Sequence, residues 1–147
     1  QNLGAKRPDR AVRSGWISAA MAAVLMSLVA LMLLLFPERI MSWFVKDREV
    51  IAMGRVFFVV IALAEPIMAF ALAIGGALRG AGDPVSPFVF ASISDLVVVI
   101  SVGYLLAVYL GMGLTGIAIA IALSAVTRAV PTMLRFRQGK WAPAGRL

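Results

Sequence analysis

The stretch Gly76-Ala77-Leu78-Arg79-Gly80-Ala81-Gly82-Asp83-Pro84 separates two long apolar segments of the chain. Either Gly80 or Gly82 suits the left-handed conformation that ends many helices. Asp83 is a favourable N-cap, and Pro84 fits the first position of a helix, where its missing N–H costs nothing. The nine residues therefore predict the end of one helix and the start of the next.

The segments on either side of this turn, and two others, are long and apolar enough to cross a membrane. Hydrophobic residues make up 62% of the chain and charged residues 14%, with a mean hydropathy of +0.97. A soluble domain of this length could not bury so much apolar surface. Segments of about 18 or more residues with at most one charge are typical of transmembrane helices. We therefore expect an all-α integral membrane protein with four transmembrane helices, at residues 15–36, 56–78, 84–110 and 114–134. A β-barrel is excluded, because its strands need only about 9–11 residues and alternate polar with apolar side chains.

The third and fourth predicted helices are separated only by Gly111-Met112-Gly113, so they should form an antiparallel hairpin. Small side chains recur every four residues in the fourth helix, at Gly116, Ala120 and Ser124. Such a ladder lets helix backbones approach closely in lipid. We interpret it as a packing surface rather than as a functional site.

Basic residues are unevenly distributed between the two sides that four spans define. Residues 1–14, expected to be a basic loop, the turn at Arg79 and the tail 135–147 share one side. That side would carry ten basic residues: Lys6, Arg7, Arg10, Arg13, Arg79, Arg128, Arg135, Arg137, Lys140 and Arg146. On the opposite side, within residues 37–55, a short amphipathic turn around Trp43 would lie at the membrane interface. The positive-inside rule then makes both chain ends cytoplasmic. The basic tails would contact anionic lipid rather than nucleic acid.

Two acidic residues, Glu65 and Asp95, lie inside the second and third predicted helices. At about 1.5 Å per residue, both lie about 14–16 Å from an end of the span, near the middle of the membrane. No basic residue is expected at that depth, so each acid should be protonated or face a water-filled cavity. Either condition suits a site for a proton, an ion or a substrate. The alternative is a neutral carboxyl group that is hydrogen-bonded to a neighbouring helix.

Pro66 directly follows Glu65. A proline inside a helix removes one hydrogen bond, and here it would leave the carbonyl of Ala62 without its donor. We expect a kink beside Glu65, where an ion or a polar ligand could bind. A static kink without a function is the alternative.

The chain contains neither Cys nor His, which excludes disulfides, thiol chemistry and imidazole ligands within it. We expect no metal site and no cofactor, so a coupling ion would bind to carboxylates, hydroxyls and carbonyls.

Gly80-Ala81-Gly82-Asp83 does match the Gly-x-Gly-Asp pattern of intramembrane aspartyl proteases. That chemistry needs a second aspartate on a neighbouring helix, whereas Asp95 follows on the same helix. We therefore do not expect an enzyme.

The stretch from Gly76 to Asp83 resembles the Gly-Ala-Leu-Arg-Gly-Ala-Gly-Asp motif of the multidrug and toxic compound extrusion (MATE) transporters. Two further segments resemble sequences of the same family. Gln1-Asn2-Leu3-Gly4-Ala5, followed by Arg10-Ala11, resembles the loop after the second helix of a lobe, and Glu65-Pro66 resembles a sequence that is common in one prokaryotic branch of the family. The resemblance implies the ninth to twelfth helices of a twelve-helix, two-lobe transporter, whose N-terminal part this chain lacks. Its motif residues would be structural: Gly76, Arg79, Gly80, Gly82, Asp83 and Pro84.

The resemblance also implies antiport. Amphipathic, often cationic compounds would be exported across a prokaryotic plasma (inner) membrane in exchange for protons or sodium, as two lobes rock. Glu65 and Asp95 would bind the proton, ion or substrate. The sequence departs from the family at Met68, where sodium-coupled members tend to have Asp, and at Leu96 and Val99, where many members have Trp and Arg. The coupling ion therefore stays open between H+ and Na+.

Two other functions stay open. A lipid-linked oligosaccharide flippase of the same superfamily would need more Arg and Lys in its cavity to bind pyrophosphate, and no basic residue is expected in the middle of these spans. A small membrane module without transport activity could assemble other subunits through its ladder of small residues. Such a module would give no role to acids that lie beside a proline.

Overall fold

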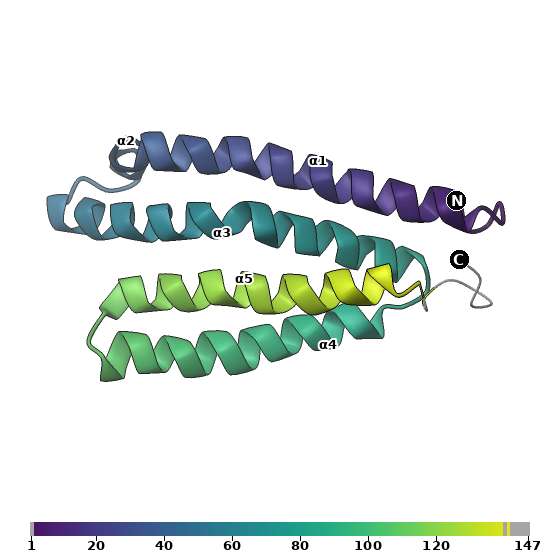
Figure 1. Cartoon of the computed structure of the whole chain (residues 1–147). Helices are drawn as coiled ribbons and strands as arrows, with labels where there is room; N and C mark the ends of the chain where they lie inside the picture. Colours follow the sequence, from purple (N-terminus) through teal and green to yellow (C-terminus); the bar gives the residue numbers. More distant parts are fainter. Residues whose placement is uncertain (1, 140, 142–147) are drawn as a thin grey trace.

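A computed structural model describes residues 2–139 and Trp141 as four long helices lying side by side (Figure 1). Each is long and apolar enough to cross a membrane, which confirms the expected all-helical fold with four spans. In chain order the elements are α1 (Pro8–Leu35), the short α2 (Pro37–Ser42), α3 (Arg48–Gly80), α4 (Val85–Ile93), η1 (Ser94–Val102), η2 (Leu105–Tyr109) and α5 (Gly113–Arg137). The segments α4, η1 and η2 form one continuous span, Val85–Tyr109, which we call the α4–η2 helix.

The helices do not lie in the order in which the chain visits them. α3 packs against α1 on one side and α5 on the other, and α5 packs against the α4–η2 helix (Figure 1). α5 therefore lies between α3 and the helix that follows α3 in sequence. The helix ends fall into two groups. At the end that we call the terminal end, α1 begins, α3 ends, α4 begins and α5 ends; α2 lies at the other end, the α2 end (Figure 1).

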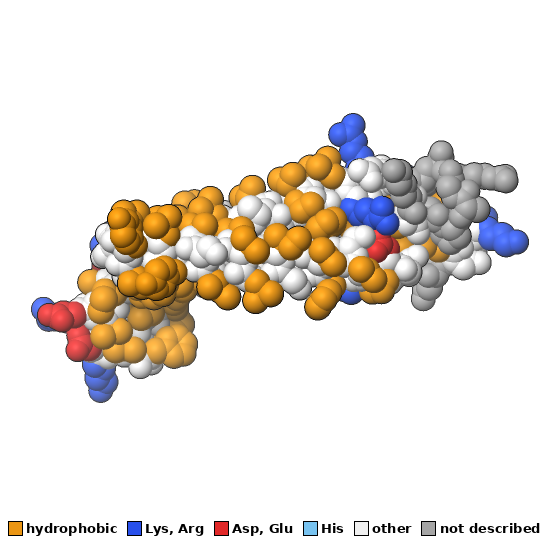
Figure 2. Space-filling view, turned by 90° about the horizontal axis from the view of Figure 1, so that it is seen from below, with side chains coloured by type: hydrophobic (Ala, Val, Ile, Leu, Met, Phe, Trp, Pro, Cys, Tyr) orange, Lys and Arg blue, Asp and Glu red, His pale blue; other side chains and the backbone are white. Residues whose placement is uncertain are grey.

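The buried positions are mostly small residues, and large apolar side chains point outward. Ala19, Ala62, Ala118 and Ala125 are almost fully buried, whereas Leu25 is 60% exposed. Figure 2 shows one face on which hydrophobic side chains cover the length of the molecule and charged side chains gather toward its two ends. This distribution is typical of helices that pack on small residues and expose their large ones to lipid.

The predicted hairpin and its ladder of small residues are both present. Gly116, Ala120 and Ser124 are buried on α5, against the α4–η2 helix. A Cβ atom at Gly116 would lie 2.6 Å from the backbone nitrogen of Ala107, so the two backbones touch there. The turn between the helices uses Gly111 and Gly113, both at positive φ.

Aromatic rings join the beginning and the end of the chain at the terminal end. The Trp16 and Phe136 rings meet edge to face at 5.4 Å, and Trp141 stacks on Phe136 at 4.9 Å. The indole nitrogen of Trp141 donates a hydrogen bond to the carbonyl of Phe136. Gly15 leaves the space for the Phe136 ring, since a Cβ there would lie 2.4 Å from the ring. These contacts hold α1 and α5 together across α3.

The structure changes the expected bounds of two segments outside the predicted spans, residues 1–14 and residues 37–55. The expected loop at residues 1–14 is wrong for its second half, because α1 already begins at Pro8, and proline fits the first turn of a helix. In the connection 37–55, α2 forms and α3 begins early, capped by Asp47, whose carboxylate accepts hydrogen bonds from the N–H groups of Glu49 and Val50. Trp43 is 72% exposed just after α2, as an interfacial side chain would be.

Backbone hydrogen bonding changes within the α4–η2 helix. α4 ends at Ile93, and π-helical bonding begins at Ser94 and continues to Val102. π-helical turns are rare and occur frequently at functional sites. The change in bonding comes directly before Asp95, one of the two acids inside the spans.

Candidate functional site

Two adjacent helices bring four polar side chains together inside the spans. Ser94 and Asp95 come from η1, and Thr127 and Arg128 come from α5. Nη2 of Arg128 donates to both carboxylate oxygens of Asp95, each at 2.6 Å. Directly before this pair on both helices, the hydroxyl of Thr127 donates to Oγ of Ser94 at 3.2 Å and to the carbonyl of Ser124. An ion pair and a hydroxyl pair thus join the two helices of the hairpin.

The cluster lies well inside the spans. Asp95 follows Val85 by ten residues, and Arg128 precedes Arg137 by nine. At about 1.5 Å per residue, both are about 14–15 Å from the terminal end of their helices. A charge at this depth in a bilayer is costly unless it is paired or hydrated. The direct pairing offsets part of that cost.

The two members of the ion pair differ in exposure. The side chain of Arg128 is 15% exposed and that of Asp95 is 56% exposed. The guanidinium is therefore enclosed by the hairpin, whereas one side of the carboxylate is open. Nε of Arg128 is buried and has no hydrogen-bond partner among the described residues.

The prediction that no basic residue lies at the depth of the acids is wrong. The apolar segment ends at Leu134, which made Arg128 look close to the membrane surface, but α5 continues to Arg137. A signal for the pair was present in the sequence. Asp95 lies 17 residues before Met112 and Arg128 lies 16 after it, so an antiparallel hairpin that turns at 111–113 brings them level.

Glu65 lies apart from this cluster. It is half-buried in the middle of α3 and has no hydrogen bond or ion pair within residues 2–139 and Trp141. It shares a face of α3 with Leu72 and Arg79, which are exposed and follow it by two and four turns. α3 has no close backbone approach to η1 in the described chain, because α5 separates them. The structure therefore does not bring Glu65 and Asp95 together.

Pro66 does not interrupt its helix. α3 runs from Arg48 to Gly80 across it, so the backbone beside Glu65 is not unwound. On the neighbouring face, Pro66 lines an apolar cavity of about 360 Å³ between α1, α3 and α5. The other lining residues are Ala23, Ile67, Phe70, Ala129, Val130 and Met133. Glu65 does not line this cavity.

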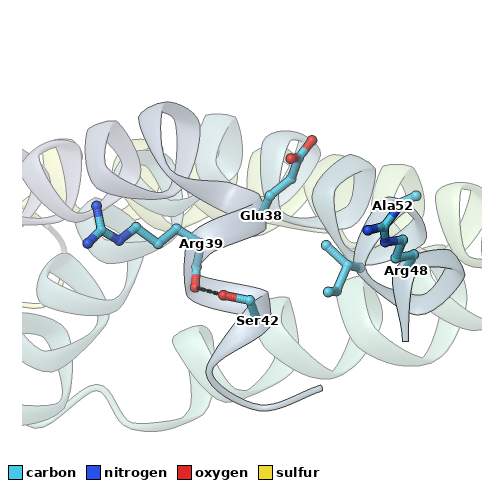
Figure 3. Close-up of a pocket in the computed structure, with 6 residues that line it drawn as sticks. Glu38, Arg39, Ser42, Arg48 and Ala52 are labelled. Carbon is cyan, nitrogen blue, oxygen red and sulfur yellow. Dashed lines mark hydrogen bonds between the residues drawn. The ribbon is translucent and has the colours of Figure 1, made fainter. Parts of the chain in front are cut away.

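A larger cavity, of about 490 Å³, lies at the α2 end (Figure 3). It is lined by Glu38, Arg39, Ser42, Arg48, Ile51 and Ala52. Figure 3 shows Arg39 and Arg48 coming from different helices, with the Ser42 hydroxyl bonded to the carbonyl of Arg39. Its place between α2 and the start of α3 makes it an open surface feature rather than part of the intramembrane cluster.

The hinge between α3 and α4 has the conformation that its residues predict. Gly82 is at positive φ, and Arg79 is exposed at the end of α3. The carboxylate of Asp83 accepts hydrogen bonds from the backbone N–H and the hydroxyl of Ser86, as an N-cap does. Pro84 precedes the first residue of α4 with helical dihedral angles.

Asp83 also makes a contact that the sequence analysis missed. Nε of Arg135 donates to its carboxylate at 2.8 Å, which ties the hinge to the last turns of α5. Partial burial acts to raise the pKa of Asp83, but the hydrogen bonds from Arg135 and Ser86 outweigh it and lower the pKa. Asp83 therefore stays ionised and holds three parts of the chain together.

Comparison with known proteins identifies the family to which these four spans belong. The MatE family model matches residues 1–105, and the chain belongs to that family. The family is one of multi-pass membrane transporters rather than enzymes.

Several curated relatives are similar over most of the chain. It is 28% identical over 88% of its length to a probable multidrug resistance protein NorM of Thermotoga maritima, of which it covers 27%. It is 30% identical over 91% of its length to a probable multidrug resistance protein NorM of Mesorhizobium japonicum, of which it covers 29%. An uncharacterized transporter, YisQ of Bacillus subtilis, is 26% identical over 97% of the chain, which covers 31% of it. The chain thus spans less than a third of the length of these relatives. No solved structure matches the chain.

Proposed function

We propose that this chain supplies the last four helices of a twelve-helix, two-lobe antiporter that exports amphipathic, often cationic compounds in exchange for protons or sodium. The similarity to multidrug resistance proteins supports the class of function. The observation that carries the proposal is the half-exposed carboxylate of Asp95 inside the spans. A carboxylate at that depth with one open side suits the binding of a proton or another cation.

Glu65 is the second proposed coupling group. It is half-buried in the middle of α3, and Leu72 and Arg79, further along the same face, are exposed. In a complete transporter, this face would meet the remaining helices or the central cavity. A carboxyl group there would be hydrated or would pair with a group outside this chain, and either arrangement allows it to change its protonation state during transport.

A lipid-linked oligosaccharide flippase is supported less well than a cation exporter. The reason is the pairing of Arg128 and not, as the sequence suggested, a lack of basic residues inside the spans. Arg128 does lie inside the spans, so the absence of basic residues no longer argues against pyrophosphate binding. Its guanidinium, however, is paired with Asp95 and largely buried. A phosphate-binding arginine needs its donors free to reach the phosphate, so the cluster favours a cationic substrate.

We further propose that the terminal end faces the cytoplasm of a prokaryotic cell and that the protein lies in the plasma (inner) membrane. Within 1–139 the basic side chains at the terminal end outnumber those at the α2 end, even after Arg128 is removed from that count. This imbalance is the pattern of the positive-inside rule.

The test is dye export by the complete transporter in proteoliposomes. With an imposed proton or sodium gradient, we expect export of ethidium to slow by about tenfold or more in Glu65→Gln and in Asp95→Asn, a range typical of coupled sites. Glu38→Gln is the matched control, because Glu38 is 60% exposed at the α2 end and its one ion pair among the described residues is with Arg55. Full gradient-driven export by Glu65→Gln would remove Glu65 from the proposal, and failure of the unaltered protein to export any cation would overturn the function itself.

A further inference from the structure

We infer that Arg128 is the built-in counter-ion of Asp95, and that an incoming cation competes with Arg128 for this carboxylate. The inference rests on the proposed antiport and adds a residue to it. Asp95 would bind the cation, and Arg128 would be a positioning residue that neutralises the carboxylate whenever the cation has left. An acid inside the spans would then have a partner in both halves of the transport cycle.

The geometry of the pair suits exchange. A single nitrogen, Nη2, bridges both oxygens of Asp95, so Arg128 does not use the two-nitrogen fork of the strongest arginine–carboxylate pairs. Its Nε is buried and unpartnered within the described chain. An unsatisfied buried donor destabilises the paired arrangement. The contact is therefore short but leaves one guanidinium donor without a partner in the described chain, as expected for an ion pair that separates during transport.

The difference in exposure gives the cation a direction of approach. The side chain of Arg128 is 15% exposed, on a helix whose residues Ala125 and Ala129 are buried, while Asp95 is open on its other side. A cation that reaches the open side comes within a few ångströms of the guanidinium. Because like charges repel strongly away from bulk water, cation and arginine cannot both keep full contact with one carboxylate.

No other charge near the cluster can take the place of Arg128. Asp95 lies on η1, which packs against α4, η2 and α5. α4 contains no titratable residue, and Tyr104 and Tyr109 lie nine and fourteen residues further along the helix. On α5, Arg135 is bound to Asp83, and Arg137 lies in the last turn. Among the described residues, the charge balance at Asp95 therefore depends on Arg128 alone.

The backbone indicates which partner moves. Arg128 is on α5, which stays α-helical from Gly113 to Arg137 across Pro131 and whose ladder of small residues is packed against the neighbouring helix. Asp95 is the second residue of a π-helical stretch that begins at Ser94. A change of bonding between π-helical and α-helical turns rotates the side chains of the following turn. Opening of the pair would therefore move η1 and would also separate Ser94 from Thr127.

The experiment measures equilibrium binding of tetraphenylphosphonium to the purified complete transporter, together with its export rate. In Arg128→Met the competitor is gone, so we expect the Kd for tetraphenylphosphonium to fall about tenfold, while export slows because release is impaired. Arg128→Lys keeps the charge and should stay within about threefold of the unaltered protein in both quantities. A purely structural role would instead leave Kd unchanged or raise it in Arg128→Met, and that result would overturn the inference.

A second measurement covers the case in which Arg128→Met does not fold. The chain has no cysteine, so Ser94→Cys and Thr127→Cys place the only two thiols within it at a contact of 3.2 Å between the native oxygens, and any cysteine elsewhere in the complete transporter is first replaced by serine. If cation binding separates η1 from α5, saturating tetraphenylphosphonium should slow oxidation of this pair by copper phenanthroline at least about threefold. An unchanged rate would overturn the inference. Because the Kd and the oxidation rate both report binding of tetraphenylphosphonium, they test the inference separately from gradient-driven export, whose absence would overturn the proposed antiport instead.

Discussion

At the scale of single residues, Asp83 connects more of the molecule than its place in a family motif suggests. Its carboxylate caps the start of α4 through Ser86 and pairs with Arg135 of α5, and it is 13% exposed. The motif therefore contains one position that acts through a distant part of the chain, while Gly80 and Gly82 have no neighbours within 4 Å of an added Cβ. An aspartate at this position is explained by folding alone.

Asp83→Asn should lower stability in a pH-dependent way. The pKa of Asp83 is lower in the folded than in the unfolded protein. Its contribution is therefore complete above the unfolded value of about 3.9 and is lost as the pH falls through the folded pKa. At pH 7 the substitution should cost about 1–2 kcal/mol, from the weakened cap and the lost ion pair.

Melting in detergent at pH 7 and at pH 3 measures this effect. The difference between Asp83→Asn and the unaltered protein should shrink at pH 3. Asp9→Asn, at an exposed aspartate in the first turn of α1, is the matched control and should melt normally at both values. A difference that persists unchanged at pH 3 would contradict the assignment of the effect to the ionised carboxylate.

At the scale of elements, the hairpin of the α4–η2 helix and α5 depends on close backbone contact. A Cβ at Gly116 would lie 2.6 Å from the nitrogen of Ala107 and 2.7 Å from the carbonyl carbon of Leu106, and backbone atoms cannot swing aside. Gly116→Ala should therefore destabilise the protein by about 2 kcal/mol, because the helices must separate. Apparent melting temperature in detergent is the measurement.

Gly76→Ala provides the comparison. Gly76 is exposed on α3, and an added Cβ would meet only the side chain of Arg79, at 3.9 Å. Alanine has the better helix propensity, so this substitution should be neutral or stabilising by up to about 1 kcal/mol. Equal melting temperatures for the two variants would show that the small-residue ladder does not hold the hairpin.

The elements also show what can be predicted from the sequence and what cannot. Length and hydropathy identified four spans, and the short turn at 111–113 identified the hairpin, since both follow from local composition. The π-helical bonding from Ser94 was not predictable, because an apolar helix has the same residue types in either hydrogen-bonding pattern. The pair of Asp95 and Arg128 was missed because depth was judged from each span separately, although counting from Met112 brings the two level. Glu65 was placed correctly within a helix, but its surroundings depend on parts of a transporter outside this chain.

At the scale of the whole molecule, the distribution of basic residues and the absence of cysteine allow a direct test of which end of the helices faces the cytoplasm. The terminal end carries the excess of basic side chains, and the α2 end carries Lys46 in the exposed connection between α2 and α3. Lys6 is exposed at the terminal end, before α1 begins. The two lysines thus lie on opposite sides of any membrane that the four helices span.

We expect Lys46→Cys to react with a membrane-impermeant maleimide in intact cells, and Lys6→Cys to react only after the membrane is permeabilised. The positive-inside rule gives the reason, since a cluster of Lys and Arg close to the spans is retained on the cytoplasmic side. The chain has no cysteine of its own, so each substitution introduces the only thiol within it. The unaltered protein, with any cysteine outside this chain replaced by serine, serves as the unlabelled control. The reverse pattern would place the terminal end outside the cell. The hinge, Arg79 and the Asp83–Arg135 contact would then lie outside as well, and the carboxylate of Asp95 would be nearer to the outer than to the inner surface.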